Sequence, residues 1–216
     1  MSVTPHTLIV GAAPVPHHEQ AYHRIVNAAE SVVAADGGLD VCLGAGRMPD
    51  IVIGDFDSVS VGVLESVRDA GATIVRFPIE KDESDLDLAL SYARNQGVSC
   101  VHFTAVSTGR LDHTLAALGT LLRSADLAGR LEEPGLDGHA LDALERPSLR
   151  LAARPGQVLS VFALDSTTRV SIAGVRYPLD NELLPVLSSL GLSNVALEVE
   201  QVVTVHVGAA VVLICA

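Results

Sequence analysis

The chain has 216 residues, of which 49% are hydrophobic and only 3% aromatic, and its formal net charge is −12. This length allows one large domain or two smaller ones with a sizeable core. Because Val, Leu, Ile and Ala must fill that core, the composition favours parallel strands covered by helices. The acidic balance, with no basic stripe, excludes nucleic acid and anionic membranes as expected partners.

The cysteines and the apolar stretches indicate the compartment. Cys42, Cys100 and Cys215 lie far apart in apolar segments, which predicts buried free thiols in a reducing environment. Residues 1–14 lack the basic start and apolar length of a signal peptide. The longest apolar stretch, 207–216, is too short to cross a bilayer. We therefore expect a cytoplasmic protein with no membrane partner.

The first 125 or so residues alternate strand and helix signals. We predict strands at 7–11, 31–35, 51–54, 72–76 and 98–105, and helices at 17–29, at 60–70, from Ser84 onward and after the fifth strand. Ser84 with Asp87 three residues later resembles a capping box, which marks a helix start. Repeated strand–helix units predict an α/β domain over residues 1–128 with a doubly wound, mostly parallel sheet.

The pattern changes near Gly129, where the helical period fades. Apolar segments at 158–164, 169–173, 194–200 and 202–207 read as strands separated by turns. Runs of this kind without intervening helices are typical of antiparallel sheets. We expect a second, all-β domain over residues 129–216.

The segment Gly54-Asp55-Phe56-Asp57-Ser58 follows the third predicted strand and carries two closely spaced carboxylates. Open α/β sheets bind their ligands at this end of the strands. Further acids stand after neighbouring strands, at Asp36, Asp82, Asp85 and Asp87. Because close carboxylates repel each other, grouping them favours a shared divalent cation, and oxygen ligands favour Mg²⁺.

Each motif also has an alternative interpretation. The acids at 54–58 could form a solvated turn, or could match the Asp-x-Asp signature of haloacid-dehalogenase-type phosphatases, with Asp55 as the nucleophile. The acids at 81–85 could merely complement a helix dipole. The segment 107–113 offers a turn, a helix start and Arg110, which suit phosphate binding. Alternatively, Arg110 and Asp112 form an ordinary surface ion pair.

In this order the motifs resemble the thiamine pyrophosphokinase family. The resemblance rests on Ala35-Asp36-Gly37-Gly38, Pro49-Asp50 with Ile53-Gly54-Asp55-Phe56-Asp57-Ser58, Lys81-Asp82-x-Ser84-Asp85 and Gly109-Arg110-x-Asp112-His113. It extends into the β-domain through Gly174-Val175-Arg176-Tyr177-Pro178-Leu179 and Gly191-Leu192-Ser193-Asn194. The resemblance implies an α/β catalytic domain, a β-sandwich that binds thiamine, and a homodimer with sites between subunits.

The activity that the resemblance implies is transfer of a diphosphate group from ATP to thiamine, with Mg²⁺ as cofactor and AMP as the second product. It assigns metal binding to Asp55, Asp57, Asp82 and Asp85, and catalysis to Asp57, Asp85, Arg110 and Asp112. It assigns substrate binding to Asp36, Gly37, Lys81, Ser84, Gly109, Ser193 and Asn194. Two alternatives stay open: a phosphatase that uses Asp55, and an inactive nucleotide-binding module if Thr108 distorts the phosphate loop.

Overall fold

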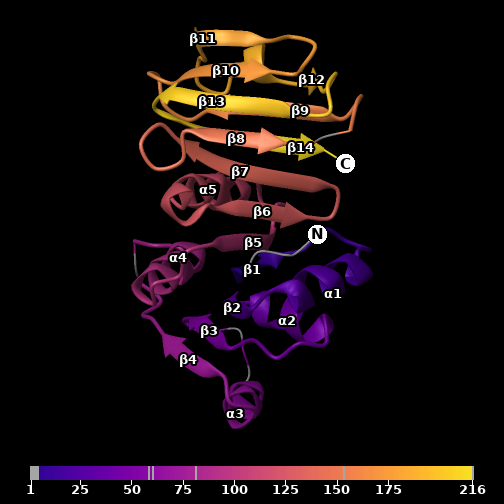
Figure 1. Cartoon of the computed structure of the whole chain (residues 1–216). Coiled ribbons are helices and arrows are strands. Elements are labelled where there is room, and N and C mark those ends of the chain that lie inside the picture. The colour runs from indigo at the N-terminus through magenta and orange to yellow at the C-terminus, as the bar shows by residue number, and fades with distance from the viewer. Residues whose placement is uncertain (1–4, 58, 60, 81, 153, 216) are drawn as a thin grey trace. The chain divides into compact units, whose positions relative to one another are not determined.

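The computed structural model describes residues 5–57, 59, 61–80, 82–152 and 154–215. The chain divides into two compact units (Figure 1). The first comprises Met1–Thr120 with Glu132–Pro134, and the second comprises Leu121–Leu131 with Gly135–Ala216. Among the helices described, none has the length and apolar character needed to span a membrane.

The first unit contains a parallel sheet with the strand order β5-β1-β2-β3-β4. Its strands are β1 (Thr7–Ala13), β2 (Ser31–Ala35), β3 (Ile51–Gly54), β4 (Thr73–Arg76) and β5 (Val101–Val106). Its helices are α1 (Glu19–Ala28), α2 (Gly38–Gly44), α3 (Val61–Asp69) and α4 (Asp85–Asn95), with most of α5 (Leu111–Leu122). The predicted doubly wound α/β architecture is confirmed.

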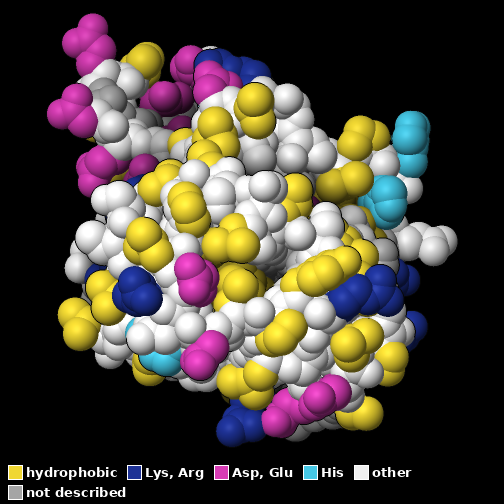
Figure 2. Space-filling view, turned by 90° about the horizontal axis from the view of Figure 1, so that it is seen from above, with side chains coloured by type: hydrophobic (Ala, Val, Ile, Leu, Met, Phe, Trp, Pro, Cys, Tyr) yellow, Lys and Arg dark blue, Asp and Glu magenta, His cyan; other side chains and the backbone are white. Residues whose placement is uncertain are grey.

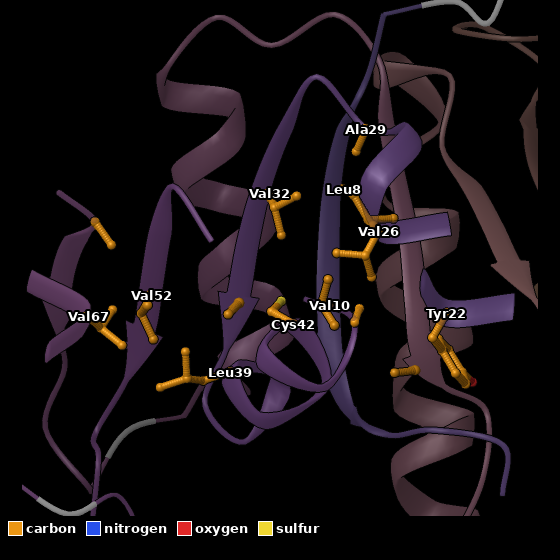
Figure 3. Packing of buried hydrophobic residues seen from close by; sticks show 14 of the residues in the cluster. Leu8, Val10, Tyr22, Val26, Ala29, Val32, Leu39, Cys42, Val52 and Val67 are labelled. Atoms are coloured by element: carbon orange, nitrogen blue, oxygen red, sulfur yellow. The ribbon is translucent and has the colours of Figure 1, made fainter. Parts of the chain in front are cut away.

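Alternate apolar residues along the strands of this unit point into a hydrophobic core. Leu8, Val10 and Val32 are fully buried and pack with residues of α1, α2 and α3, as Figure 3 shows for Val26 and Leu39. The residues between them point to the other face of the sheet, because side chains alternate along a strand. Helix α4 contacts β1, β2 and β3 but supplies none of the described residues of that cluster. The sheet is therefore covered on both faces, as its apolar strands require.

The second unit is a sandwich of two antiparallel sheets, with strand orders β12-β9-β14-β7 and β11-β10-β13-β8. The strands are β7 (Leu136–Asp142), β8 (Ser148–Leu151), β9 (Val158–Ala163), β10 (Arg169–Ala173), β11 (Leu179–Leu183), β12 (Asn194–Val195), β13 (Gln201–Val207) and β14 (Ala209–Cys215). Buried residues of both sheets, such as Val161 and Ile172, form one core. Short 3₁₀ turns occupy Ala125–Leu127 and Ser189–Gly191, and β6 (Arg130–Glu133) spans the boundary between the units.

The structure corrects several sequence expectations. The predicted strand 194–200 is wrong beyond Ala196. Asn194–Val195 pair with β9, Ala196 forms an isolated bridge with Val175, and the strand goes no further. The sequence did not predict six elements of the structure: α2, β6, β7, β8, β11 and β14. The first five are short or rich in Gly or polar residues, whereas β14 is a continuous apolar run without alternation. The three cysteines form no disulfide, but the expected burial holds only for Cys42, because Cys100 is partly exposed and Cys215 is exposed.

Candidate active site

A cavity of about 1150 Å³ lies at the carboxyl ends of the parallel strands in the first unit. Its walls are the ends of β1, β2, β3 and β5 and the first turns of α4 and α5. The cavity brings together seven of the sequence-predicted site residues: Asp36, Asp55, Ser84, Asp85, Gly109, Arg110 and Asp112. Gly37, Asp57 and Asp82 are not among its lining residues. Lys81 and Ser58 lie outside the described residues.

Asp36 directly follows β2 in an unusual backbone conformation. Its φ is +46°, a left-handed region that Asp tolerates better than most residues. Its backbone N–H donates to the carbonyl of Ile53 on the neighbouring strand, with an N···O distance of 2.7 Å. The turn directs the carboxyl group toward β3, where its Oδ1 is buried and has no hydrogen-bond partner. A buried carboxylate oxygen without a donor is costly, which makes this atom a candidate metal ligand.

The electrostatics around Asp36 agree with that interpretation. Burial raises the pKa of the Asp36 carboxyl, and the negative charges of Asp85, Asp55 and Asp57 raise it further, against the lowering effect of a backbone hydrogen bond from Gly37. Three carboxylates from two other chain segments therefore raise the cost of a negative charge on Asp36. A divalent cation is the chemical species that relieves such repulsion, and an all-oxygen donor set fits Mg²⁺.

The segment after β3 is held in place by its own backbone and by Arg76. Asp55 Oδ1 accepts a hydrogen bond from the Asp57 N–H at 3.1 Å, while Arg76 donates to the Asp55 carbonyl at 2.9 Å. Phe56, between the two acids, has φ +59° and is 5% exposed. The Arg76 guanidinium lies 5.1 Å from the centroid of its ring. Burial of Phe56 therefore anchors the backbone between the two aspartates. The sequence pattern did not single out Arg76, although its position at the end of β4 was a usable signal.

Helix α4 begins as the sequence predicts. Ser84 is the N-cap: its Oγ accepts a hydrogen bond from the Asp87 N–H at 3.2 Å and donates one to Asp87 Oδ2 at 2.9 Å. Asp87 Oδ1 also accepts from Thr120 of α5 at 2.6 Å. Asp87 is thus used in capping and helix packing, whereas Asp85 in the first turn lines the cavity. Asp82 is exposed.

Arg110 and Asp112 form the ion pair that the alternative interpretation allowed. Two hydrogen bonds join them, from Nη2 at 2.6 Å and from Nε at 3.2 Å, with side chains 72% and 64% exposed. The guanidinium lowers the pKa of Asp112 to about 2. Surface pairs of this kind add little stability. The place of the pair at the cavity wall makes Arg110 a candidate for binding an anion.

Thr108 does not distort the loop between β5 and α5. Thr108 is not among the described residues with a positive φ, whereas the next residue, Gly109, has φ +81°. The Thr108 hydroxyl instead hydrogen-bonds the carbonyls of Ala13 and Pro14, at 2.9 and 3.0 Å. The positive φ, which a β-branched residue such as Thr disfavours, is therefore adopted by Gly109.

Ser193 and Asn194 belong to the second unit. The Asn194 amide is 3% exposed and is engaged with the backbone. Its Oδ1 accepts from the N–H groups of Tyr177 and Val195, both at 3.0 Å, and its Nδ2 donates to the Tyr177 carbonyl at 2.7 Å. Ser193 is exposed with φ +55°, and its N–H donates to Ser160. The structure thus gives Asn194 a scaffolding role, and its contact with a ligand stays a prediction.

One further group of metal-type side chains lies among the described residues, with ligand atoms of His6, His102 and Glu132 within 4.8 Å of one another. It lies at the amino ends of β1 and β5, away from the strand ends that form the cavity. The two imidazoles are stacked, with centroids 3.9 Å apart and planes 22° apart. Because their nitrogen lone pairs lie in the ring planes, two stacked rings do not converge on one ion. We interpret this cluster as packing.

Comparison with known proteins assigns the chain to a family. The model of the thiamin pyrophosphokinase catalytic domain matches residues 22–130, and the model of the thiamin pyrophosphokinase vitamin B1 binding domain matches residues 148–212. The chain belongs to the thiamin pyrophosphokinase family. The first match contains every predicted metal and catalytic residue, and the second contains Ser193 and Asn194.

Individual members of the thiamin pyrophosphokinase family agree with this assignment. The thiamine pyrophosphokinase of Bacillus subtilis is 23% identical over 163 residues, which cover 75% of this chain and 76% of that protein. The crystal structure from the same organism superposes with a TM-score of 0.79 at 20% identity over 97% of this chain and 98% of that one. The enzyme structure from Candida albicans gives 0.77 at 14% identity, with 98% and 90% covered. These matches give no support to a phosphatase or an inactive module.

Proposed function

We propose that this protein transfers a diphosphate group from ATP to the hydroxyethyl oxygen of thiamine. The thiamine oxygen attacks the β-phosphorus, and the bond from that phosphorus to the oxygen bridging to the α-phosphorus breaks. AMP leaves, and the hydroxyl proton passes to a base or to solvent. Catalysis of such transfers consists mainly of holding the reactants in line and neutralising charge.

The observation that carries the proposal is the buried Asp36 oxygen among the charges of Asp85, Asp55 and Asp57, in a cavity within the matched catalytic segment. Asp55, Asp57 and Asp85 would hold Mg²⁺, with Asp36 and Asp82 as supporting acids. Bound Mg²⁺ would neutralise phosphate charge and orient the chain of phosphates. Without it, the net charge of −12 would repel ATP.

Cationic and backbone groups, chiefly from the loop between β5 and α5, would complete the phosphate site. Arg110 can present a planar fork of donors to the transferring group, while Gly109 lets the backbone approach closely. We assign ATP binding to Gly37, Ser84 and Lys81 solely because these residues match the family pattern. With its pKa near 2, Asp112 is a weak base at neutral pH, which favours an orienting role toward Arg110 over proton abstraction.

We assign thiamine binding to the second unit, with Ser193 as the contact and Asn194 as its support. The match to a vitamin B1 binding domain favours this assignment. We further propose a homodimer in which the partner subunit supplies these contacts. Hydrophobic side chains lie at many points of the surface that Figure 2 shows. The exposed large apolar residues of the second unit include Leu183, Leu187, Leu190, Leu192 and Val199. Exposed apolar surface of this kind is typical of protein–protein contacts. Action in the cytoplasm stays a prediction.

A product assay tests the proposed function. The protein is incubated with Mg²⁺ and ATP, with and without thiamine, and the products are identified by mass spectrometry. AMP and thiamine diphosphate should form in equal amounts and only when thiamine is present. Asp57→Asn should abolish both products while leaving the circular dichroism spectrum unchanged, because it removes one anionic ligand. Inorganic phosphate released without thiamine would instead indicate a phosphatase.

A further inference from the structure

The two loops that line the cavity after β1 and β5 meet where the β-ladder is irregular. The register between β1 and β5 shifts between Val10 and Ala13. Ala105 has φ +56°, although it is fully buried. At Gly11 the strands are so close that a Cβ would lie 2.6 Å from Val106 Cγ1. An interrupted ladder leaves backbone donors that need other partners.

A buried side-chain network supplies those partners. Glu133, at the end of β6, is 6% exposed and accepts a hydrogen bond at each carboxylate oxygen. The Val106 N–H donates to Oε1 at 2.8 Å, and the Tyr22 hydroxyl donates to Oε2 at 2.7 Å. The same hydroxyl accepts from the Val15 N–H at 2.7 Å. One carboxylate thus ties the end of β5 to α1 and, through Tyr22, to the loop after β1.

The Tyr22–Glu133 network ends at the cavity on one side and next to a cavity-lining residue on the other. Val106 lines it directly, and Val15 follows Pro14, another lining residue. Thr108 joins the same two loops through its bonds to Ala13 and Pro14. Arg110 is two residues beyond Thr108. The spacing of the two loops therefore depends on two sets of hydrogen bonds that are built from side chains.

We propose that Tyr22 and Glu133 are positioning residues that fix the spacing of the two loops around ATP, an inference that rests on the proposed function. The network acts through the backbone of the loops and touches no reacting atom. A displacement of about 1 Å in a positioning element can cost about 100-fold in rate. A carboxylate suits the task because both of its oxygens accept, whereas an amide keeps only one acceptor.

Three variants and a control test the proposal in the full chain. Tyr22→Phe removes the hydroxyl, Glu133→Gln replaces one acceptor by a donor, and Thr108→Val removes the second link. Tyr92→Phe, on α4 and away from the cavity lining, is the control for loss of a hydroxyl. For each protein we would measure kcat, the KM values for ATP and thiamine, and the melting temperature. We would also measure backbone amide exchange at Ala12, Ala13 and Val15, since Pro14 and Pro16 have no N–H, and over 104–108.

We expect Tyr22→Phe and Glu133→Gln to lower kcat/KM for ATP by about 10- to 100-fold and to speed amide exchange in both loops, with the KM for thiamine and the control unchanged. Faster exchange and a lower melting temperature with unchanged kcat/KM would overturn the proposal, since the network would then be structural only. Unchanged exchange would show that the network does not hold the loops.

A binding measurement separates this proposal from the proposed function. Calorimetry with Mg²⁺ and a non-hydrolysable ATP analogue needs no thiamine. If the wild type binds the analogue but makes no thiamine diphosphate, the proposed function fails, yet weaker binding by Tyr22→Phe still supports the network. Equal affinity in wild type and variants, together with equal kcat/KM, would reject it.

Discussion

Asp36 and Gly54 touch across neighbouring parallel strands. A Cβ on Gly54 would lie 3.2 Å from both the Cα and the Oδ1 of Asp36, although the backbone of Gly54 does not have a positive φ. Glycine is therefore required at position 54 because a side chain would not fit beside Asp36, and not because the backbone conformation demands it. The carboxyl group of Asp36 occupies the volume that any other side chain at position 54 would take.

Gly54→Ala should accordingly impair the metal site without unfolding the protein. The added methyl group must displace Asp36 by a few tenths of an ångström, and we expect the Mg²⁺ concentration for half-maximal activity to rise about 10-fold. Gly44→Ala is the matched control, because nothing lies within 4 Å of its Cβ position. A magnesium titration of both variants decides the point. Equal curves for Gly54→Ala and wild type would show that Asp36 does not depend on this contact.

Asp36→Asn should raise stability and lower activity. Burial and the nearby charges of Asp85 and Asp55 raise the pKa of Asp36, so the folded state binds this proton more tightly than the unfolded state does. The wild type therefore loses stability as pH rises from the ordinary pKa of Asp to the raised value. Asn carries no charge, and the metal-free variant should melt at a higher temperature than wild type at pH 7. Activity should fall roughly 10- to 100-fold.

Thermal unfolding in EDTA at pH 4 and pH 7 measures this effect. The difference between Asp36→Asn and wild type should be larger at pH 7 than at pH 4. Asp40→Asn, an exposed acid on α2, serves as the control. A variant that melts below wild type at pH 7 without metal would mean that the Asp36 carboxylate stabilises the apoprotein, contrary to the repulsion described above.

Much of the catalytic unit could be predicted from the sequence. Apolar runs that end in Asp, such as β2 before Asp36, fix both the strand and the position of its acid. Ser84 is the N-cap that its spacing to Asp87 predicts. The parts that were missed depend on distant partners. Glu133 lies 111 residues from Tyr22, and the sequence around neither residue indicates that the two side chains form a hydrogen bond. Strand β14 is apolar throughout because both of its faces carry buried residues, such as Val211 and Val212, so it shows no alternation.

Arg110→Lys should lower kcat by about 100-fold if the guanidinium stabilises charge on the transferring group. An ammonium group can reproduce neither the fork toward phosphate nor the two bonds to Asp112. Arg68→Lys, on the exposed face of α3, is the control. Steady-state kinetics with varied ATP separates the possibilities. If kcat is unchanged and only the KM for ATP rises, Arg110 binds the nucleotide but does not act in the transfer step.

The proposed sharing of sites between subunits can be tested by mixing two inactive proteins. One carries Asp57→Asn in the first unit, and the other carries Ser193→Ala in the second. Asn194 is unsuitable here, because its amide holds Tyr177, and its loss should lower the free energy of unfolding by about 1–3 kcal/mol. The mixture is assayed at a thiamine concentration at which each variant alone is inactive.

In a two-fold symmetric dimer, each heterodimer would contain one site with both halves intact. Random exchange makes about half of the dimers mixed, so about a quarter of the wild-type activity should return. Mass spectrometry of the native dimers verifies that subunits have exchanged, and two copies of the Asp57→Asn protein mixed together provide the baseline. Complete exchange without recovery would place the whole site within one chain, and the thiamine contacts would then have to come from the same subunit that holds the aspartates.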